Sequence, residues 1–171
     1  MTPLSLTRFW LRLAQCMLLL AACTPAAAQL NVSKSADLSF GGFVASATSG
    51  TVVVAPGGGR STTGGVVLFG QLLAGVPTVA AAAFNVSGGT ANVVCTITLP
   101  AETTLTRSGG GSMRASALLS STGAGLTPSL TLNSSGAASF TVGATLSVAA
   151  SQATGNYGPA DLTVSVNCPN P

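Results

Sequence analysis

Few side chains in this sequence can do acid–base or nucleophilic chemistry. The chain has three carboxylates, four cysteines and no histidine. The lack of histidine excludes a Ser-His-Asp triad and a histidine-ligated zinc. The carboxylates Asp37, Glu102 and Asp161 could supply an acid–base pair of the glycosidase kind. Each lies near the end of a predicted strand, however, where a solvated surface group is the better interpretation. We therefore expect no enzymatic activity and no cofactor.

The positions of the cysteines predict one disulfide. Two of the four lie in the leader described below, which leaves Cys95 and Cys168. Each belongs to the apolar, inward-facing set of a predicted strand. An even pair of inward cysteines in an exported chain is typical of a disulfide, either between strands or between sheets. Two buried free thiols are the alternative. Two cysteines cannot form a four-cysteine site, so we expect no metal.

The N-terminal segment has the anatomy of a secretory signal peptide. Arg8 and Arg12 precede an apolar run that has the length of an h-region and is too short to span a bilayer comfortably. A stretch of small residues ends at Ala28 and offers a cleavage site before Gln29. We expect residues 1–28 to be removed.

The same segment is compatible with a second kind of processing. Residues 20–23 (Leu-Ala-Ala-Cys) resemble the lipobox of bacterial lipoproteins, in which the cysteine is lipidated and becomes the N-terminus. Such a string arises easily by chance in a segment rich in Leu and Ala, so we favour cleavage after Ala28. Either route exports the protein to the periplasm, the cell surface or the extracellular space. Attachment to a membrane is expected only if Cys23 is lipidated.

The charge that remains after removal of the leader is low. Four cations and three carboxylates give a net charge of +1, because the +3 of the whole sequence includes Arg8 and Arg12. No basic patch is left to neutralise phosphates, so we expect no nucleic-acid partner.

Apolar residues alternate with polar ones in the segments that we predict to be strands. The two clearest are 140–148 and 161–168, joined by a turn-rich loop. The composition is only 5% charged and rich in Ala, Gly, Ser and Thr, which disfavours helices and suits strands and turns. Further short strands are predicted at 30–40, 51–55, 65–69, 80–87, 92–99, 112–118 and 129–133.

Short strands at this spacing, separated by turn signals, predict a single all-β domain over residues 29–171. We expect an immunoglobulin-like β-sandwich of antiparallel strands, and a closed β-barrel is the alternative. The glycine run at 57–59 predicts a hairpin turn between two of the strands.

Most of the phenylalanines fall on apolar patterns. Four of them are expected in the core: Phe40, Phe69, Phe84 and Phe140. The pattern leaves Phe43 ambiguous. Tyr157 is the aromatic candidate for stacking on a sugar, but we expect it to cap the core from its loop.

An ordered series of short motifs resembles a known bacterial family. In chain order the motifs are 38–41 (Leu-Ser-Phe-Gly), 50–54 (Gly-Thr-Val-Val-Val), 83–88 (Ala-Phe-Asn-Val-Ser-Gly), 96–100 (Thr-Ile-Thr-Leu-Pro), 142–146 (Val-Gly-Ala-Thr-Leu) and 162–167 (Leu-Thr-Val-Ser-Val-Asn). Together they resemble bacterial domain-of-unknown-function family 4402, which is similar to spore-coat-U and chaperone–usher pilin-like secreted sandwiches. The resemblance implies a surface or pilus-like role and no established activity.

Two features depart from the pattern of that family. Cys168 stands where an aromatic residue is expected after Asn167. One extra residue separates Gly155 from Tyr157 in the turn before the last strand. Neither departure changes the predicted fold, but the second leaves the local turn open.

Two classes of function fit these observations. The first is a structural subunit or adhesin of a surface fibre, which assembles with itself or with related surface subunits. The second is a stand-alone binding module for a sugar or a protein, either secreted or lipid-anchored.

The N-terminal arm from Gln29 to Asp37 offers a means of self-assembly. Because the chain has so few charged residues, they cannot guard all of its strand edges. An unguarded edge can accept a strand from another chain. The alternation predicts a donor strand with one apolar face: Leu30, Val32, Ala36 and Leu38. Lys34 on that face argues against this role, and the arm is alternatively the first strand of its own sandwich.

Overall fold

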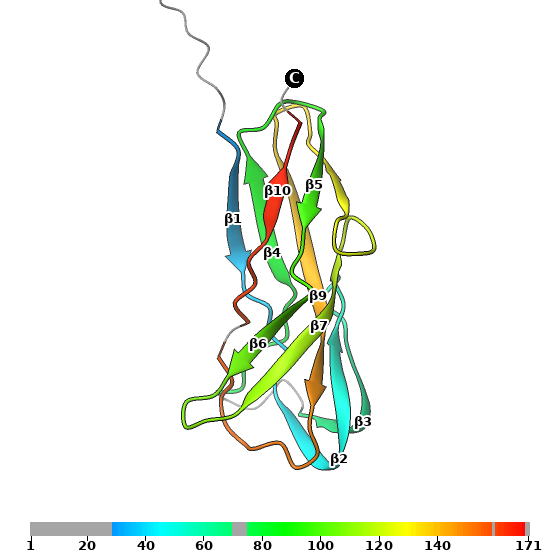
Figure 1. Ribbon diagram of the computed structural model, residues 1–171, viewed down its shortest axis with the longest axis vertical. Coiled ribbons are helices and arrows are strands. Elements are labelled where there is room, and N and C mark those ends of the chain that lie inside the picture. Colours follow the sequence, from blue (N-terminus) through cyan, green and yellow to red (C-terminus); the bar gives the residue numbers. More distant parts are fainter. Residues whose placement is uncertain (1–28, 70–74, 159, 170–171) are drawn as a thin grey trace, which may run out of the picture.

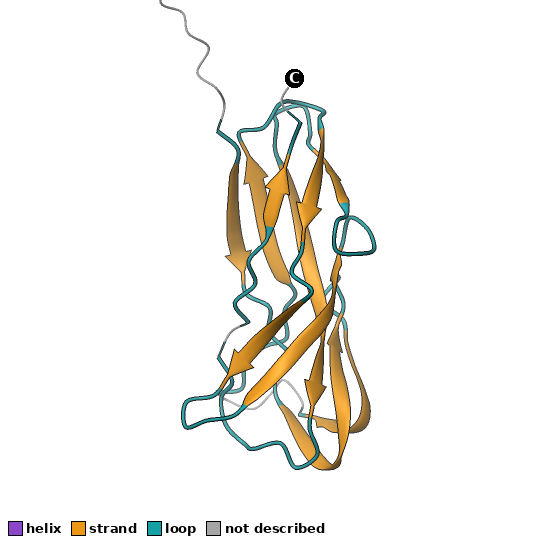
Figure 2. Ribbon diagram, in the orientation of Figure 1, coloured by secondary structure: helices purple, strands orange, loops and turns teal. Residues whose placement is uncertain are grey.

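A computed structural model describes residues 29–69, 75–158 and 160–169 of the chain. The predicted signal segment 1–28, with its cleavage at Ala28 and the alternative lipidation at Cys23, lies outside the described residues. The regular elements of the described part are all β-strands (Figure 2), and this part contains no helix that could cross a membrane. The strands are β1 (Asn31–Ala36), β2 (Phe43–Val54), β3 (Arg60–Leu68), β4 (Ala82–Ser87), β5 (Val94–Thr98), β6 (Glu102–Thr106), β7 (Ser112–Ser120), β8 (Ser129–Thr131), β9 (Ala138–Val148) and β10 (Ser165–Asn167).

The strands form two antiparallel sheets (Figure 1). The larger sheet has seven strands, with β9 at its centre. Val142 of β9 pairs with both Ala82 of β4 and Ser120 of β7, so β4 and β7 lie on opposite edges of β9. β2 pairs with the C-terminal half of β9 and is followed by β3, whereas β4 pairs with the N-terminal half and is followed by β1. The smaller sheet has the order β10-β5-β8.

Both sheets have open edges among the described strands. β1 and β3 end the path through the larger sheet, β6 pairs with β7 beside it, and β10 and β8 end the smaller one. The described strands therefore do not close into the alternative barrel. An all-β structure with two antiparallel sheets is consistent with the predicted β-sandwich.

Side chains that alternate along the strands build the core. In β4, Ala82, Phe84 and Val86 are buried, and the residues between them are more exposed. The rings of Phe84 and Phe140 stack with their centroids 5.2 Å apart. Phe40 is also buried, so three of the four predicted core phenylalanines are confirmed.

The prediction for Phe69 is wrong, because this residue is 41% exposed. In β3 the buried residue is Val66, while Val67 points to solvent. Phe69 directly follows β3, two residues after Val67, so its side chain points to the same outward face. The sequence of this stretch is continuously apolar, so its pattern could not distinguish the two faces.

Cys95 and Cys168 form the predicted disulfide, with their Cα atoms 4.2 Å apart. Cys95 lies in β5, and Cys168 directly follows β10, whose Asn167 pairs with Thr96. The bond therefore joins neighbouring strands of the smaller sheet rather than the two sheets. Disulfides persist in oxidising compartments, so this bond indicates an extracytoplasmic setting.

Candidate functional site

β1 is held at the edge of the larger sheet. Among the described strands it pairs with β4 alone, with Val32 opposite Val86 and Lys34 opposite Phe84. Leu30 and Val32 pack against the core, but every residue of β1 is exposed or only half-buried. Figure 1 shows β1 as the blue strand at one side of the molecule. The arm predicted to be a donor strand is thus an edge strand of its own chain when the chain is alone.

The predicted apolar face of the arm is interrupted. The register with β4 shifts between Lys34 and Ala36, which puts Ala36 opposite Ala83. Ala83 lies between the inward residues of β4 and so faces away from the core. Leu30 and Val32 contact the core, and Leu38 is buried beyond the strand. The expectation of one shared face is wrong for Ala36, because strict alternation cannot foresee an extra residue in the ladder.

Lys34 takes an inward position without burying its charge. It lies opposite Phe84 in the ladder, and its Nζ atom forms an ion pair with Oδ1 of Asp37. Both side chains remain well exposed. A lysine can lay its aliphatic stem along apolar surface while its amino group reaches water. Lys34 is therefore compatible with a strand that inserts Leu30 and Val32 into a core.

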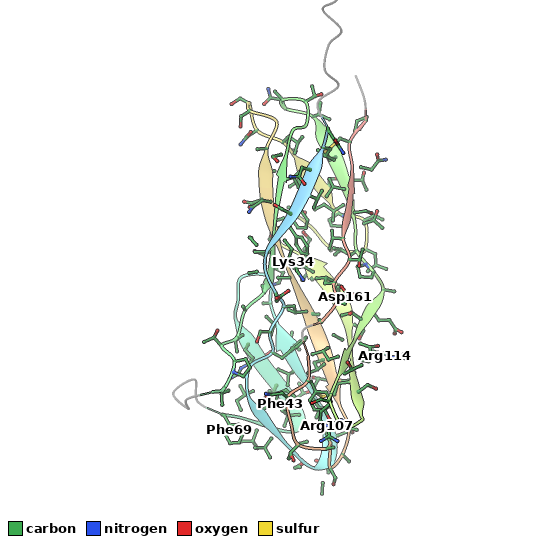
Figure 3. The ribbon with its side chains drawn as sticks, turned by 90° about the vertical axis from the view of Figure 1, so that its left-hand side faces the viewer. Lys34, Phe43, Phe69, Arg107, Arg114 and Asp161 are labelled. Atoms are coloured by element: carbon green, nitrogen blue, oxygen red, sulfur yellow. A yellow bond between two sulfur atoms is a disulfide. The ribbon has the colours of Figure 1, made fainter. Side chains whose placement is uncertain are left out.

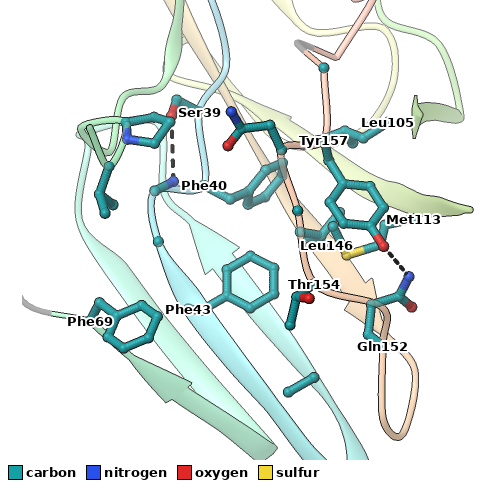
Figure 4. A pocket seen from close by; sticks show the side chains of 18 of the residues that line it. Ser39, Phe40, Phe43, Phe69, Leu105, Met113, Leu146, Gln152, Thr154 and Tyr157 are labelled. Carbon is teal, nitrogen blue, oxygen red and sulfur yellow. Dashed lines mark hydrogen bonds between the residues drawn. The ribbon is translucent and has the colours of Figure 1, made fainter. Parts of the chain in front are cut away.

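A cleft of about 650 Å³ opens beside β2, β6 and β7 (Figure 4). One wall consists of residues 37–45 together with Phe69, Val76 and Pro77, and the opposite wall is the loop 152–158. The floor consists of buried side chains of the larger sheet: Leu105, Met113 and Leu146. Because these three side chains are almost inaccessible to water, the solvent-exposed surface of the cleft belongs mainly to its walls.

Hydrogen bonds fix the wall formed by the loop 152–158. The hydroxyl of Tyr157 donates to the carbonyl of Ala153 at 2.8 Å and accepts from Nε2 of Gln152 at 2.7 Å. Nη1 of Arg107 donates to the carbonyl of Thr154 at 2.8 Å. Tyr157 is half-buried and packs against the core, in agreement with the predicted capping role.

A second arginine holds the opposite wall. Nη1 of Arg60 donates to the carbonyls of Phe40 and Gly42, at 3.0 and 3.1 Å. Its Nη2 donates to the carbonyl of Phe69 at 3.2 Å. This guanidinium therefore links the segment before β2 to the exposed Phe69, which follows β3.

The three carboxylates do not gather into a site. Asp37, Glu102 and Asp161 are all exposed. Asp37 pairs with Lys34, and Oε2 of Glu102 lies 3.0 Å from Nη1 of Arg114. Among the described residues no three His, Cys, Asp or Glu side chains are grouped closely enough to hold a metal. Of the three carboxylates, only Asp37 lines the cleft.

The sequence matches the model of the family described as Domain of unknown function (DUF4402) over residues 30–168. The chain belongs to the DUF4402 family. This confirms the resemblance seen in the ordered motifs. Neither a curated protein nor a solved structure matches the chain. The matched span of this DUF4402 protein includes β1, both walls of the cleft and the disulfide.

Sequence patterns pointed to the arm and missed the cleft. The walls of the cleft come from parts of the chain that lie far apart, at 37–45, at Phe69 and 75–77, and at 152–158. The available signals were the ambiguous Phe43 and the loop residue Tyr157. Figure 3 shows Phe43 and Phe69 toward the lower end of the molecule and Lys34 nearer its middle.

Proposed function

We propose that this DUF4402 protein is an exported structural subunit of a pilus-like fibre on the cell surface, without catalytic activity. Its sandwich would be of the immunoglobulin-like type. The observation that carries the proposal is the position of β1. This strand begins the domain, has β4 as its partner among the described strands and contributes no fully buried residue.

A strand with these properties can be supplied by another copy of the chain. The main-chain hydrogen bonds to β4 and the contacts of Leu30 and Val32 are the same whichever copy provides them. Exchange therefore costs little beyond the rearrangement of the hinge and the lost freedom of the joined subunits. Ala36 and Asp37, where the regular ladder ends, are the natural hinge.

The geometry of such an exchange favours a fibre over a closed dimer. Each subunit would offer β1 to the next and expose its own β4 edge to the previous one. A head-to-tail contact of this kind repeats as an open filament unless the rotation closes a ring. The low charge of the chain, 5% of its residues, gives little protection against such pairing.

The test is the oligomeric state of the oxidised chain beginning at Gln29, measured by size-exclusion chromatography with light scattering over a range of concentrations. We expect a ladder of oligomers for this chain and a folded monomer after deletion of residues 29–36. Deletion that unfolds the domain, or a full-length chain that stays monomeric at high concentration, contradicts the proposal.

A covalent lock provides a second test without shortening the chain. Ser33 and Asn85 are paired across β1 and β4, so Ser33→Cys/Asn85→Cys, oxidised as a monomer at low concentration, should hold β1 on its own domain and prevent the ladder when the protein is then concentrated. The matched control is Thr51→Cys/Thr63→Cys, which links the paired strands β2 and β3 and leaves β1 free. A ladder that forms from monomers already closed by the first lock contradicts exchange of β1.

The cleft supports a second candidate function, a stand-alone binding module. Its walls are fixed by Arg60 and Arg107, as expected of a preformed site. In this case the secreted protein elutes as a single species and binds a ligand at the cleft.

A further inference from the structure

We infer that the cleft binds one small, uncharged and largely apolar molecule, of the size of a medium-chain fatty alcohol. This inference deepens the second candidate function and does not require exchange of β1, because no residue of the described β1 lines the cleft.

The size and surface of the cleft fit a small ligand. Its volume of about 650 Å³ lies within the range of small-molecule sites, which are mostly apolar with a few polar groups. Phe43, which packs against the core, and Phe69, which is exposed, both line the cleft (Figure 4). Phe69 is 41% exposed although its side chain is large and apolar. A ligand that covers Phe69 would remove this side chain from water, which is the main favourable term for an apolar molecule.

The charges around the cleft argue against an anionic ligand. The guanidinium groups of Arg60 and Arg107 donate to backbone carbonyls of the two walls. Among the described residues Asp37 is the one charged side chain in the lining, and it already pairs with Lys34. A carboxylate or phosphate in the cleft would lose hydration without gaining a cation.

The polar groups of the cleft argue against a sugar. The hydroxyl of Tyr157 is engaged with both Ala153 and Gln152. Few polar side chains in the lining are left to form hydrogen bonds with the many hydroxyls of a sugar. The rings of Phe43 and Phe69 have no polar atom that needs a hydrogen-bond partner. The amide of Asn156 and the hydroxyl of Thr154, which also line the cleft, suit a single neutral polar head.

The first experiment titrates the neutral fluorophore N-phenyl-1-naphthylamine into the oxidised chain beginning at Gln29. We expect saturable binding, and displacement of the fluorophore by 1-decanol. Decanoate and decyltrimethylammonium should compete at least about tenfold less well, because the cleft offers neither charged group an unengaged partner. Failure of the fluorophore to bind overturns the inference. So does a charged competitor equal to 1-decanol, or displacement by maltose.

Variants then locate the binding. Ala153 lines the cleft and its side chain is exposed, so Ala153→Trp should fill the cleft and abolish binding without unfolding the protein. Phe69→Ala should weaken binding about fivefold or more through lost apolar contact. The control is Val94→Ala, another exposed apolar residue, in the smaller sheet, which should leave affinity unchanged. Unchanged affinity in both cleft variants would show that the fluorophore binds elsewhere.

The same titration on the monomeric variant Ser33→Cys/Asn85→Cys, in which β1 is held on its own domain, separates this inference from the fibre proposal. Affinity should be retained within about twofold, since β1 contributes nothing to the lining. A monomeric full-length chain that binds 1-decanol contradicts the fibre alone, and a polymerising chain that binds nothing contradicts the cleft alone.

Discussion

β9 and β1 both pair with β4, yet the sheet holds them very differently. β9 also pairs with β2 and β7, and most of its inward residues are buried. β1 has β4 alone among the described strands, and each of its residues is exposed or half-buried. One strand therefore contacts neighbours along both edges, whereas the other contacts a neighbour along one.

This difference separates the part of the molecule that stabilises the fold from the part that can leave it. Loss of β9 would break every pairing at the centre of the larger sheet, so its opening should require global unfolding. Loss of β1 breaks one pairing and uncovers a limited apolar surface. An arm that detaches while the rest stays folded is what strand exchange requires.

The largest effect is expected at the centre of β9. Leu146 is fully buried, so Leu146→Ala should lower the free energy of unfolding by about 3–5 kcal/mol through lost burial and a cavity. Urea denaturation of the oxidised protein measures this. Leu126→Ala, at an exposed leucine, is the control and should change stability by about 0.5 kcal/mol or less. A loss below about 1 kcal/mol at Leu146 would contradict the central role of β9.

The next effect is expected at the disulfide. The double variant Cys95→Ala/Cys168→Ala should lose about 2–4 kcal/mol, because the bond closes a long loop in the unfolded chain. Urea denaturation gives the loss, and mass spectrometry of the unreduced wild type should show no free thiol in the domain. Wild-type protein with two free thiols there would refute the bond itself.

A matched pair of valines sharpens the comparison between the two strands. Val142→Ala in β9 should cost roughly 2–3 kcal/mol, since this side chain is fully buried. Val32→Ala in β1 should cost about 1 kcal/mol or less, since its side chain is half-buried. Native-state hydrogen exchange should likewise show the amides of β1 exchanging well before those of β9. Equal costs and equal protection would mean that β1 is an integral strand.

The smallest effect is expected at the ion pair of the arm. Lys34 and Asp37 are both well exposed, so their coupling should be about 0.5 kcal/mol or less and should shrink as salt is added. A double-mutant cycle with Lys34→Ala and Asp37→Ala measures it. A coupling above about 1 kcal/mol would mean that the pair fixes the hinge after β1.

Simple alternation predicted much of the fold because most inward residues are apolar. It located the segment that became β9, the hairpin turn at 57–59 and the pairing of Cys95 with Cys168. It missed β6, where a buried polar residue interrupts the apolar pattern. Thr103 is buried there because its hydroxyl donates to the carbonyl of Asp161 at 2.9 Å.

Irregular ladders account for the other differences. The strand predicted at 51–55 begins earlier in the structure, at Phe43. Its first part was missed because the register between β2 and β3 shifts between Ala45 and Gly50, which interrupts the alternation of apolar and polar residues. The irregularity in β1 reverses the face of Ala36 in the same way. The cleft depends on contacts between segments far apart in the chain, which local patterns cannot encode.

The measurement that tests exchange of β1 most directly combines two single-cysteine variants. Ser33→Cys and Asn85→Cys are each prepared with the native disulfide intact, unfolded together in urea, refolded at high concentration and oxidised. Because Ser33 and Asn85 are paired, a bond between the two variants forms where β1 of one chain lies against β4 of another. We predict a covalent heterodimer on non-reducing gels, abundant in the mixture and scarce in either variant alone. If the mixture stays uncrosslinked while the double variant closes within single chains, β1 remains in its own domain and the account is contradicted.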